Sequence, residues 1–553
     1  MKMSKNNKKP NTKSLAKNII KSVLGQVPFT AELYWLIRHR DKTINSRFSL
    51  KSLDEALPEI VSKINGLKYR IKLDNEEKKK IFIFATLHYW IEHAALTGLV
   101  LSAQGHEISF GFLPYHDWQN EINRFDLRRQ NIYAKQVLNQ AKAAMEIVPF
   151  MDLNAGYKIL PEELKDKVED VARFDSMYTL QVEDVDEAGE IFKMRCQRNL
   201  FAARAALDWM EQNKPDVVLV PNGTIQEFAV VYEVARYLDI PAVTYEFGDQ
   251  RQRIWIAQNS KVMHQNTDDM WEVFKDLPLH RGEKARIHEL FEARRKASVW
   301  KNFSRLWQKV PAKGVEIARE ELGLDERPVV LLATNVLGDS LTLGREIFSS
   351  SMEEWLERTL QYFAGKPEVQ LVIRIHPGEV LIHGQSMADV INRVLPVLPE
   401  HIHVIGPEEK VNTYDLIAAA DLGLVYTTTV GLEMAISGVP VIVVGDTHYR
   451  GKGFTLDPQS WVKYYKMLKA VFEDPESHKL TDEQIELAWA YAYRFFFDFP
   501  RPFPWHLVSR WDDYNKMSIK DVFDSKNWDE YKYVFGYLAG EQIDWEFIRE
   551  NNL

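Results

Sequence analysis

The chain contains almost no cysteine: Cys196 is the only one among 553 residues. A single thiol excludes an intramolecular disulfide framework and a zinc site built from several thiolates. The sequence also has no apolar run of the roughly 18 to 20 residues that cross a bilayer, and no hydrophobic core of a signal peptide. We therefore expect a protein that stays in a reducing compartment, the cytoplasm.

An excess of positive charge is missing as well. The formal net charge is -9, which argues against a general nucleic-acid-binding protein. The chain is 45% hydrophobic and 27% charged and has no low-complexity tract, as in ordinary globular proteins. Because 553 residues exceed what one hydrophobic core supports, we expect two domains with extensions.

The N-terminus differs from the rest of the chain. Seven lysines precede the first acidic residue, Glu32, and apolar residues between 15 and 24 recur near helical spacing. One interpretation is a basic amphipathic helix on the anionic inner face of the cytoplasmic membrane. The other is a solvated tail. The following segment, 29–40, is predicted to be a helix packed on the first domain.

The stretch 415–453 contains the clearest structural pattern. Residues 422–426 are apolar enough for a buried strand, and 441–444 form a second such run. Between them lie a turn of three threonines, a helix through Ser437 and a helix-breaking sequence at 438–440. Strand, helix and strand at this spacing predict a βαβ unit, and therefore a parallel sheet.

The threonine turn falls where parallel sheets bind their ligands, beyond the carboxyl ends of the strands. The hydroxyl groups of Thr428 and Thr429 and the backbone N–H of Gly431 suit a phosphate at the start of a helix. Glu433, in the first turn of that helix, is placed to reach ribose hydroxyls. The alternative is an ordinary βαβ unit in which the threonines cap the helix and Glu433 favours its dipole.

Polar residues also follow the other strands expected in the second half, at 328–333, 370–375 and 401–405. Asn335 and Ser340 follow the first of these strands, and Arg374 and His376 stand at the end of the second. A histidine held by a following proline has a fixed backbone and can donate to a phosphate. A capping or core role for His376 is the alternative.

The first half predicts a second parallel sheet, with strands at 81–85, 108–113, 217–220 and 242–245 and mostly helix between 118 and 212. It has no G-x-G-x-x-G fingerprint, so NAD or FAD binding has little support. The last two strands end in polar, glycine-bearing turns on what we expect to be the active edge of the sheet. The residues in these turns are Asn222, Gly223, Glu246, Asp249 and Arg251.

The fold class predicted from these patterns is α/β with two Rossmann-like domains and helical extensions. The expected divisions are a basic tail with N-terminal helices at 1–75, a first Rossmann-like domain with a helical insertion at 76–267, a helical linker at 268–325, a second Rossmann-like domain at 326–470 and a helical, aromatic-rich extension at 471–553.

An ordered set of motifs resembles the bacterial capsule polysaccharide biosynthesis family of GT-B glycosyltransferases, which includes retaining β-Kdo transferases. The resemblance covers roughly residues 216–457. Its motifs are PNG at 221–223, E-x-G at 246–248, R-x-H-P at 374–377, TTTVGLEMAISGVPVIVVG at 427–445 and HYRGKG at 448–453.

The resemblance implies a GT-B arrangement of two domains facing a cleft and transfer of a sugar from a nucleotide-activated donor, CMP-linked rather than UDP- or GDP-linked. The acceptor is a glycan or glycolipid precursor of a surface polysaccharide, and nucleic acid is not a partner. No D-x-D stands at a convincing strand end, so we expect no obligatory metal and no cofactor. By resemblance, the donor nucleotide is bound by Arg374, His376, Thr428, Thr429 and Gly431, with Glu433 nearby, and the candidate catalytic residues are Glu246 and His376. Positions at strand ends add Asn335 and Ser340 to the donor site, and Asn222, Gly223, Asp249 and Arg251 to the acceptor or substrate site.

Three alternatives remain open at this point. A polyol-phosphate transferase of the wall-teichoic type shares R-x-H-P, but its usual D-Y-S-S turn is absent here. A sugar-nucleotide 2-epimerase shares the GT-B arrangement and needs no acceptor. A non-catalytic scaffold of polysaccharide assembly would use the basic tail to sit on the membrane.

Overall fold

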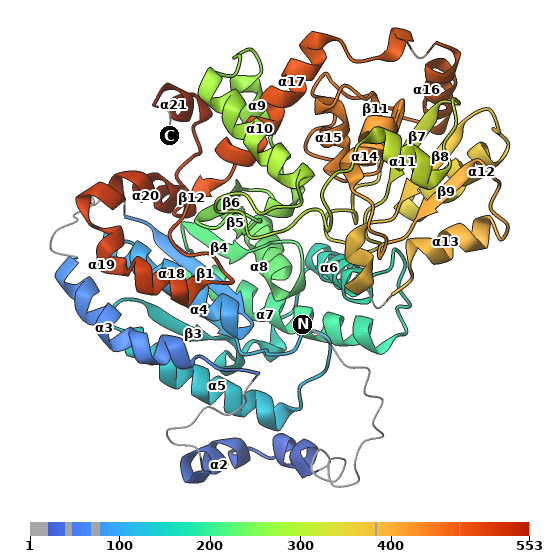
Figure 1. Ribbon diagram of the computed structural model, residues 1–553. Helices are drawn as coiled ribbons and strands as arrows, with labels where there is room; N and C mark the ends of the chain where they lie inside the picture. The colour runs from blue at the N-terminus through green and yellow to red at the C-terminus, as the bar shows by residue number, and fades with distance from the viewer. Residues whose placement is uncertain (1–19, 39–46, 68–77, 382–383, 475, 552–553) are drawn as a thin grey trace. The chain divides into compact units, whose positions relative to one another are not determined.

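The computed structural model describes residues 20–38, 47–67, 78–381, 384–474 and 476–551 (Figure 1). The chain divides into two compact units. Unit 1 comprises residues up to 172, 193–245 and 503–541, and unit 2 comprises 173–192, 246–502 and the residues from 542 onward. Most of the basic N-terminal tail lies outside the described residues.

Unit 1 contains five parallel strands in the order β5-β4-β1-β2-β3. Their bounds are β1 (Lys80–Thr86), β2 (Glu107–Leu113), β3 (Glu146–Pro149), β4 (Val217–Pro221) and β5 (Ala242–Glu246). Four of them match the predicted strands. The segment 118–212 is mostly helical, as predicted, but it also contains β3, which was not predicted. The four residues of β3 are too few to show a period and become a strand by pairing with β2.

Aromatic packing fixes the centre of unit 1. Phe82 in β1 stacks on Trp209, with ring centroids 4.4 Å apart, and on Phe150 at 6.0 Å. Gly111 in β2 makes room for this stack, since a Cβ there would lie 2.5 Å from the Phe82 ring. His93 is fully buried beside these strands, and its Nε2 donates to the Trp505 carbonyl at 3.1 Å. Burial lowers its pKa to about 3. It is therefore a neutral core histidine.

Unit 2 contains a five-stranded parallel sheet in the order β11-β10-β7-β8-β9. The strands are β7 (Val329–Ala333), β8 (Gln370–Arg374), β9 (Ile402–Ile405), β10 (Leu422–Val425) and β11 (Val441–Val443), each at a position predicted from sequence. In both sheets the second and third strands are added on one side of the first strand, and the fourth and fifth strands are added on its other side. This is the Rossmann-like strand order, and it confirms the predicted α/β fold class.

Side chains of β7 alternate between two hydrophobic cores of unit 2. Val329, Leu331 and Ala333 join a core with the aromatic segment 488–499, whereas Val330 and Leu332 pack with α12 and α16. Both faces of the sheet are thus covered, which explains why its strands read as unbroken apolar runs. The remaining strands, β6 (Arg253–Gln258) and β12 (Arg501–Pro502), pair with each other in antiparallel fashion and were not predicted.

Helices account for most of the remaining chain. Before β6 they are α2 (Thr30–Arg38), α3 (Lys51–Leu67), α4 (His88–Gln104), α5 (Arg124–Leu138), α6 (Glu162–Leu180), α7 (Glu190–Asn213) and α8 (Gln226–Tyr237). After β6 they are α9 (Asp268–Phe274), α10 (Arg281–Arg295), α11 (Val315–Leu322), α12 (Met352–Ala364), α13 (Met387–Val394), α14 (Thr413–Ala419), α15 (Val430–Ile436), α16 (Trp461–Glu473), α17 (Asp482–Tyr493), α18 (Arg510–Lys516), α19 (Ile519–Val522), α20 (Ser525–Leu538) and α21 (Trp545–Glu550).

Two segments predicted as a linker and an extension contribute to these cores. In the segment 268–325, α9 and α10 bury apolar side chains, among them Trp271 and Phe291, in the first core of unit 2. The C-terminal residues 503–541 belong to unit 1, where Arg510 forms a salt bridge with the buried Glu92 of α4.

Candidate nucleotide-sugar site

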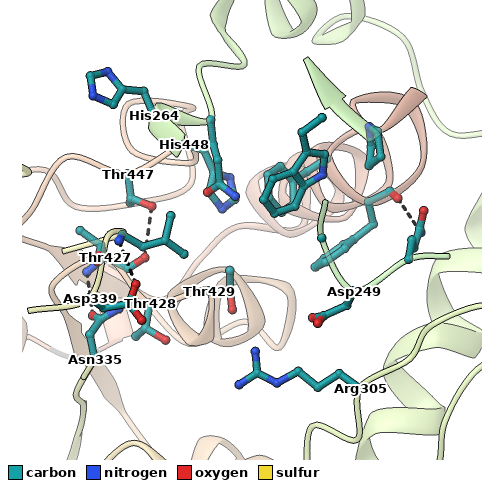
Figure 2. A pocket seen from close by; sticks show the side chains of 18 of the residues that line it. Asp249, His264, Arg305, Asn335, Asp339, Thr427, Thr428, Thr429, Thr447 and His448 are labelled. Carbon is teal, nitrogen blue, oxygen red and sulfur yellow. Dashed lines mark hydrogen bonds between the residues drawn. The ribbon is translucent and has the colours of Figure 1, made fainter. Parts of the chain in front are cut away.

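A cavity of about 340 Å³ lies within unit 2, beyond the carboxyl ends of β7, β8, β10 and β11 (Figure 2). It borders the point where the chain, having added strands on one side of β7, returns to place β10 on the other side. Such a switch point is where open parallel sheets bind ligands. Its lining residues come from several separate segments between 247 and 500, and all of them belong to unit 2.

The threonine turn forms one wall of this cavity, and Thr427, Thr428 and Thr429 all line it. The Thr427 backbone N–H donates to Asn335 Oδ1 at 3.2 Å, which ties the ends of β10 and β7 together. Thr447 Oγ1 donates to the Thr427 carbonyl at 3.2 Å from the loop after β11. Among the described residues, the buried Thr427 Oγ1 has no hydrogen-bond partner. Hydrogen bonds therefore fix the backbone of the turn, while the Thr427 hydroxyl has no partner among the described residues.

Gly431 keeps the turn in place without lining the cavity. A Cβ at Gly431 would lie 2.4 Å from the hydroxyl of the buried Tyr449, and that hydroxyl donates to the Thr428 carbonyl at 2.6 Å. Glycine at this position thus permits the close approach of Tyr449, whose hydrogen bond holds the backbone of Thr428 in place. The structure assigns Gly431 a packing contact where the sequence predicted a nucleotide contact.

His376 lines the cavity from the end of β8, as predicted. Burial, with the nearby Arg305 and Arg374, lowers its pKa to about 4, so the ring is neutral at physiological pH. The Gly378 backbone N–H donates to Nδ1 at 3.0 Å. A neutral imidazole that accepts at Nδ1 carries its proton on Nε2, which leaves Nε2 as a hydrogen-bond donor.

His448 is a second histidine of the cavity, and it was not among the predicted site residues. Its ring stacks on Phe495 with centroids 3.7 Å apart, and Nδ1 lies 2.9 Å from the Tyr491 hydroxyl. Nε2 is buried without a partner among the described residues. The sequence signal that could have identified His448 is the H-Y-R-G-K-G motif, which begins at this residue. The motif contributed to the family resemblance, but its histidine was given no role.

Asp249 and Arg305 lie across the cavity from the threonine turn, as Figure 2 shows. Hydrogen bonds join the segments that carry these two residues. Ser304, next to Arg305, donates to the Asp249 carbonyl from its N–H at 2.8 Å and from its hydroxyl at 3.0 Å. The sequence named Asp249 as an acceptor contact but gave no signal for Arg305, because position 305 fell in a predicted helical linker. Tertiary contacts alone bring that guanidinium to the site.

Six aromatic residues complete the wall and give the cavity an apolar face beside its polar one. They are Phe247, Trp255, Phe303, Trp307, Phe495 and Phe496. The last two come from the aromatic-rich segment, to which the sequence assigned only packing. Aromatic surface with a few convergent polar groups is typical of small-molecule sites.

Glu433 does not line the cavity and pairs with a buried arginine. Glu433 Oε1 accepts from Arg294 Nη1 at 2.8 Å, and both side chains are almost fully buried. Burial raises the pKa of the Glu433 carboxyl above its ordinary value, although Arg294 opposes the rise. The Arg294 guanidinium also lies over the rings of Trp307 at 4.1 Å and Phe496 at 4.7 Å. Glu433 therefore holds Arg294 against the aromatic wall. The sequence had predicted that Glu433 contacts ribose.

Four other predicted residues of unit 2 are not among those lining the cavity: Arg374, Ser340, Arg251 and Glu246. Arg374 is buried and donates from Nη1 to the Gly406 carbonyl at 2.7 Å. The Arg251 N–H donates to the Asn302 carbonyl at 3.0 Å. Glu246 ends β5, and its Oε1 accepts from the N–H of the next residue at 3.0 Å. Of the three predicted carboxylates, Glu246, Asp249 and Glu433, only Asp249 lines the cavity.

The remaining predicted residues, Asn222 and Gly223, lie in unit 1 at the end of β4. Both have positive φ, 57° and 75°, and a Cβ on Gly223 would lie 2.5 Å from the Thr244 side chain. Asn222 Oδ1 accepts from the Thr224 N–H at 3.0 Å. They shape a tight turn at the carboxyl edge of the unit 1 sheet.

Two searches of the described part of the chain gave negative results. No group of three or more His, Cys, Asp or Glu side chains in it is arranged to hold a metal ion. None of the helices described is both long and apolar enough to cross a membrane.

Comparison with known families gives one match, to the family described as capsule polysaccharide biosynthesis protein, over residues 259–473. The resemblance to this family that the motifs predicted is confirmed over this segment. The matched residues include the threonine turn, the His-Pro motif and Arg305. A search of the curated proteins found no match.

Among solved structures, the β-Kdo 2,4 transferase KpsC of Thermosulfurimonas dismutans is 17% identical, with a TM-score of 0.32, over 50% of this chain and 78% of that chain. The β-Kdo 2,7 transferase KpsC of the same organism is 15% identical, with a TM-score of 0.30, over 55% and 87%. The UDP-GlcNAc 2-epimerase of Neisseria meningitidis is 14% identical, with a TM-score of 0.24, over 76% and 100%. The assignment of fold rests on the strand orders of the two sheets and not on these scores.

Proposed function

We propose that the protein is a glycosyltransferase that moves a sugar from a nucleotide-activated donor, CMP-linked by preference, to a glycan or glycolipid precursor of a surface polysaccharide. The observation that carries the proposal is the convergence of hydroxyl, imidazole and guanidinium donors on one cavity at a switch point of the sheet. The match to the capsule polysaccharide biosynthesis family supports the choice of pathway.

In this proposal the donor phosphate binds between the threonine turn, His376 Nε2 and Arg305. Sugar transfer leaves extra negative charge on the departing nucleotide, and donors already in place stabilise that charge without reorganisation. The aromatic wall packs against the base or sugar and keeps water from the reacting bond, which matters because hydrolysis competes with transfer. Asp249, across the cavity from the turn, acts as the catalytic carboxylate, either as base or as nucleophile.

We propose that the acceptor binds to unit 1. The turn at Asn222 and Gly223 leads into α8, where polar atoms of Thr224, Gln226 and Glu227 are buried without partners among the described residues. Buried polar atoms are normally paired, so unpaired ones at a ligand-binding edge indicate a place for an incoming hydroxyl-rich molecule. We propose that the acceptor glycan supplies those partners.

Binding of nucleotides tests the donor site. We expect CMP, or one of UDP, GDP and CDP, to raise the melting temperature of the wild type, since a hundredfold excess over the dissociation constant adds about 2.7 kcal/mol of stability. His376→Ala should bind that nucleotide at least about tenfold more weakly, because it loses the Nε2 donor to phosphate. Thermal shift measured over a nucleotide titration gives both results.

His401→Ala is the matched control for this experiment. His401 is a buried histidine of the same unit, contacts the Phe363 carbonyl at 2.8 Å and does not line the cavity. Its replacement should lower the melting temperature and leave the nucleotide-induced shift intact. If no nucleotide shifts the wild type, the donor site is refuted and a scaffold role becomes the better explanation.

The proposed reaction uses no metal ion, because the charge of the Arg305 guanidinium and hydrogen bonds from His376 and the threonine hydroxyls stabilise the phosphate. We expect sugar transfer to retain more than about half of its rate in excess EDTA, since removing a required metal would remove several kcal/mol of transition-state stabilisation. The measurement is the initial rate with EDTA and with added Mg²⁺. A strict requirement for Mg²⁺ would contradict this part of the proposal while leaving nucleotide binding to His376 unaffected.

A further inference from the structure

Helix α2 packs on unit 1 through one side only. Trp35 is buried, with its ring 6.1 Å from that of Tyr133 in α5, and Tyr34 meets Phe125 of α5 at 5.5 Å. Glu32 pairs with Arg128, which lies on the same helix α5. These contacts fix which side of α2 faces the protein (Figure 1).

The other side of α2 is apolar and exposed. Phe29, directly before the helix, is 77% exposed, and Leu33, Leu36 and Ile37 are 59%, 64% and 70% exposed. Leu33, Leu36 and Ile37 lie within α2, and their spacing of three residues and one residue places them on one face of the helix. Four apolar residues of the preceding segment, Ile20, Val23, Leu24 and Val27, are exposed as well. Together these eight residues form the α2 stripe. Exposed apolar side chains gathered in this number mark an interaction surface.

The charge around the α2 stripe indicates what covers it. Seven lysines and no acidic residue precede Glu32, in a chain whose net charge is -9. Glu32 itself is neutralised by Arg128, and of the seven lysines Lys21 pairs with Asp126 at 2.6 Å. The part of the chain that leads into the stripe is thus rich in lysine and has no acidic residue. A second copy of the chain would bring two such lysine-rich segments together, whereas an anionic surface attracts them.

We propose that the α2 stripe lies on an anionic phospholipid surface, with its apolar side chains at the boundary between headgroups and acyl chains. The lysines that precede it bind the lipid phosphates. Apolar insertion and electrostatic attraction are each weak alone, and stable attachment of a protein to a bilayer surface needs both. From the sequence, a membrane role was one of two interpretations of the basic tail, and residues 29–40 were predicted to be a helix packed on the first domain. The structure extends the membrane surface to the outer face of α2, and nothing in this inference depends on the reaction.

Sedimentation with vesicles tests the proposal. We expect the wild-type protein to bind vesicles of phosphatidylcholine with about 30 mol% phosphatidylglycerol, and to bind pure phosphatidylcholine vesicles several-fold less well. The variant L33Q/L36Q/I37Q should lose at least about tenfold in its partition coefficient, because three inserted side chains become polar. Raising NaCl from about 0.1 M to about 0.5 M should also weaken wild-type binding, since salt screens the lysines.

A matched control replaces three exposed apolar residues elsewhere. Ile159, Val397 and Val508 are 84%, 84% and 83% exposed, so I159Q/V397Q/V508Q removes as many apolar side chains as the α2 variant. The control should bind vesicles within about twofold of wild type, and both variants should keep the wild-type melting temperature, since exposed substitutions change stability little. Vesicle binding by L33Q/L36Q/I37Q equal to wild type would overturn the proposal. So would a wild-type dimer, measured by light scattering, that this variant converts to a monomer, because the stripe would then be a subunit interface.

Discussion

Replacing Asp249 by asparagine is expected to lower the rate of sugar transfer by about a hundredfold to ten-thousandfold, the range that a positioned acid–base group contributes. Asp249 is the predicted carboxylate that lines the cavity, and its main chain is fixed by two hydrogen bonds from Ser304. Asparagine keeps the size of the side chain and removes its ability to take a proton or attack carbon. The loss should therefore appear in kcat, with the affinity for nucleotide unchanged.

Glu246→Gln is the control for Asp249→Asn. Glu246 was the first candidate from sequence, but it does not line the cavity. We expect its replacement to reduce the rate less than about tenfold, in the absence of a direct chemical role. If Glu246→Gln loses activity and Asp249→Asn keeps it, the original candidate is right and the assignment made from the cavity is wrong. The same assay, run without acceptor, detects isomerisation of the donor sugar and so separates a transferase from an epimerase.

Glu433→Ala is expected to reduce the free energy of unfolding by about 3–5 kcal/mol, the cost of leaving one member of a buried ion pair alone. The substitution leaves the Arg294 guanidinium in a site from which water is excluded. Because Arg294 also packs over Trp307 and Phe496, the aromatic wall of the cavity should loosen and the nucleotide-induced thermal shift should shrink. Denaturant unfolding with and without nucleotide measures both effects.

Glu292→Ala is the matched control for Glu433→Ala. Glu292 lies on α10 with Arg294, and its ion pair with Arg295 is about half exposed. Exposed pairs contribute only about 0–1 kcal/mol, so this variant should unfold nearly as the wild type does. A Glu433→Ala protein of wild-type stability that no longer binds nucleotide would restore the original hypothesis of a ribose contact and contradict the structural role.

The sequence predicted the sheets well because their strands carry a strong local signal. All five strands of the unit 2 sheet were located from apolar runs of the kind that a sheet covered on both faces requires. The short β3 and the antiparallel pair β6 and β12 were missed, since strands of two to six residues without a clear run form only by pairing with a partner. Local pattern and tertiary pairing each decided a different set of strands.

The same division holds in the candidate site. Thr428, Thr429, His376 and Asn335 could be named from sequence because each follows directly after a strand, and the carboxyl ends of parallel strands meet at one edge. Glu433 and Gly431 stand in the same motif, yet the helical period turns Glu433 inward to Arg294 and places Gly431 under Tyr449. Sequence spacing gives the element on which a residue lies, but the side on which it faces depends on what packs against that element.

By itself, the sequence determined the α/β class, the positions of most strands and the turns that carry polar groups, because these follow from short-range periodicity and turn chemistry. Only the tertiary structure decided which of those groups share a cavity. It brought Arg305 and the aromatic residues to the threonine turn from segments far away in the chain, placed Asp249 but not Glu246 in the lining of the cavity, and left the outer face of α2 exposed. These choices depend on contacts between residues separated by tens to hundreds of positions, and no local pattern in the sequence encodes them.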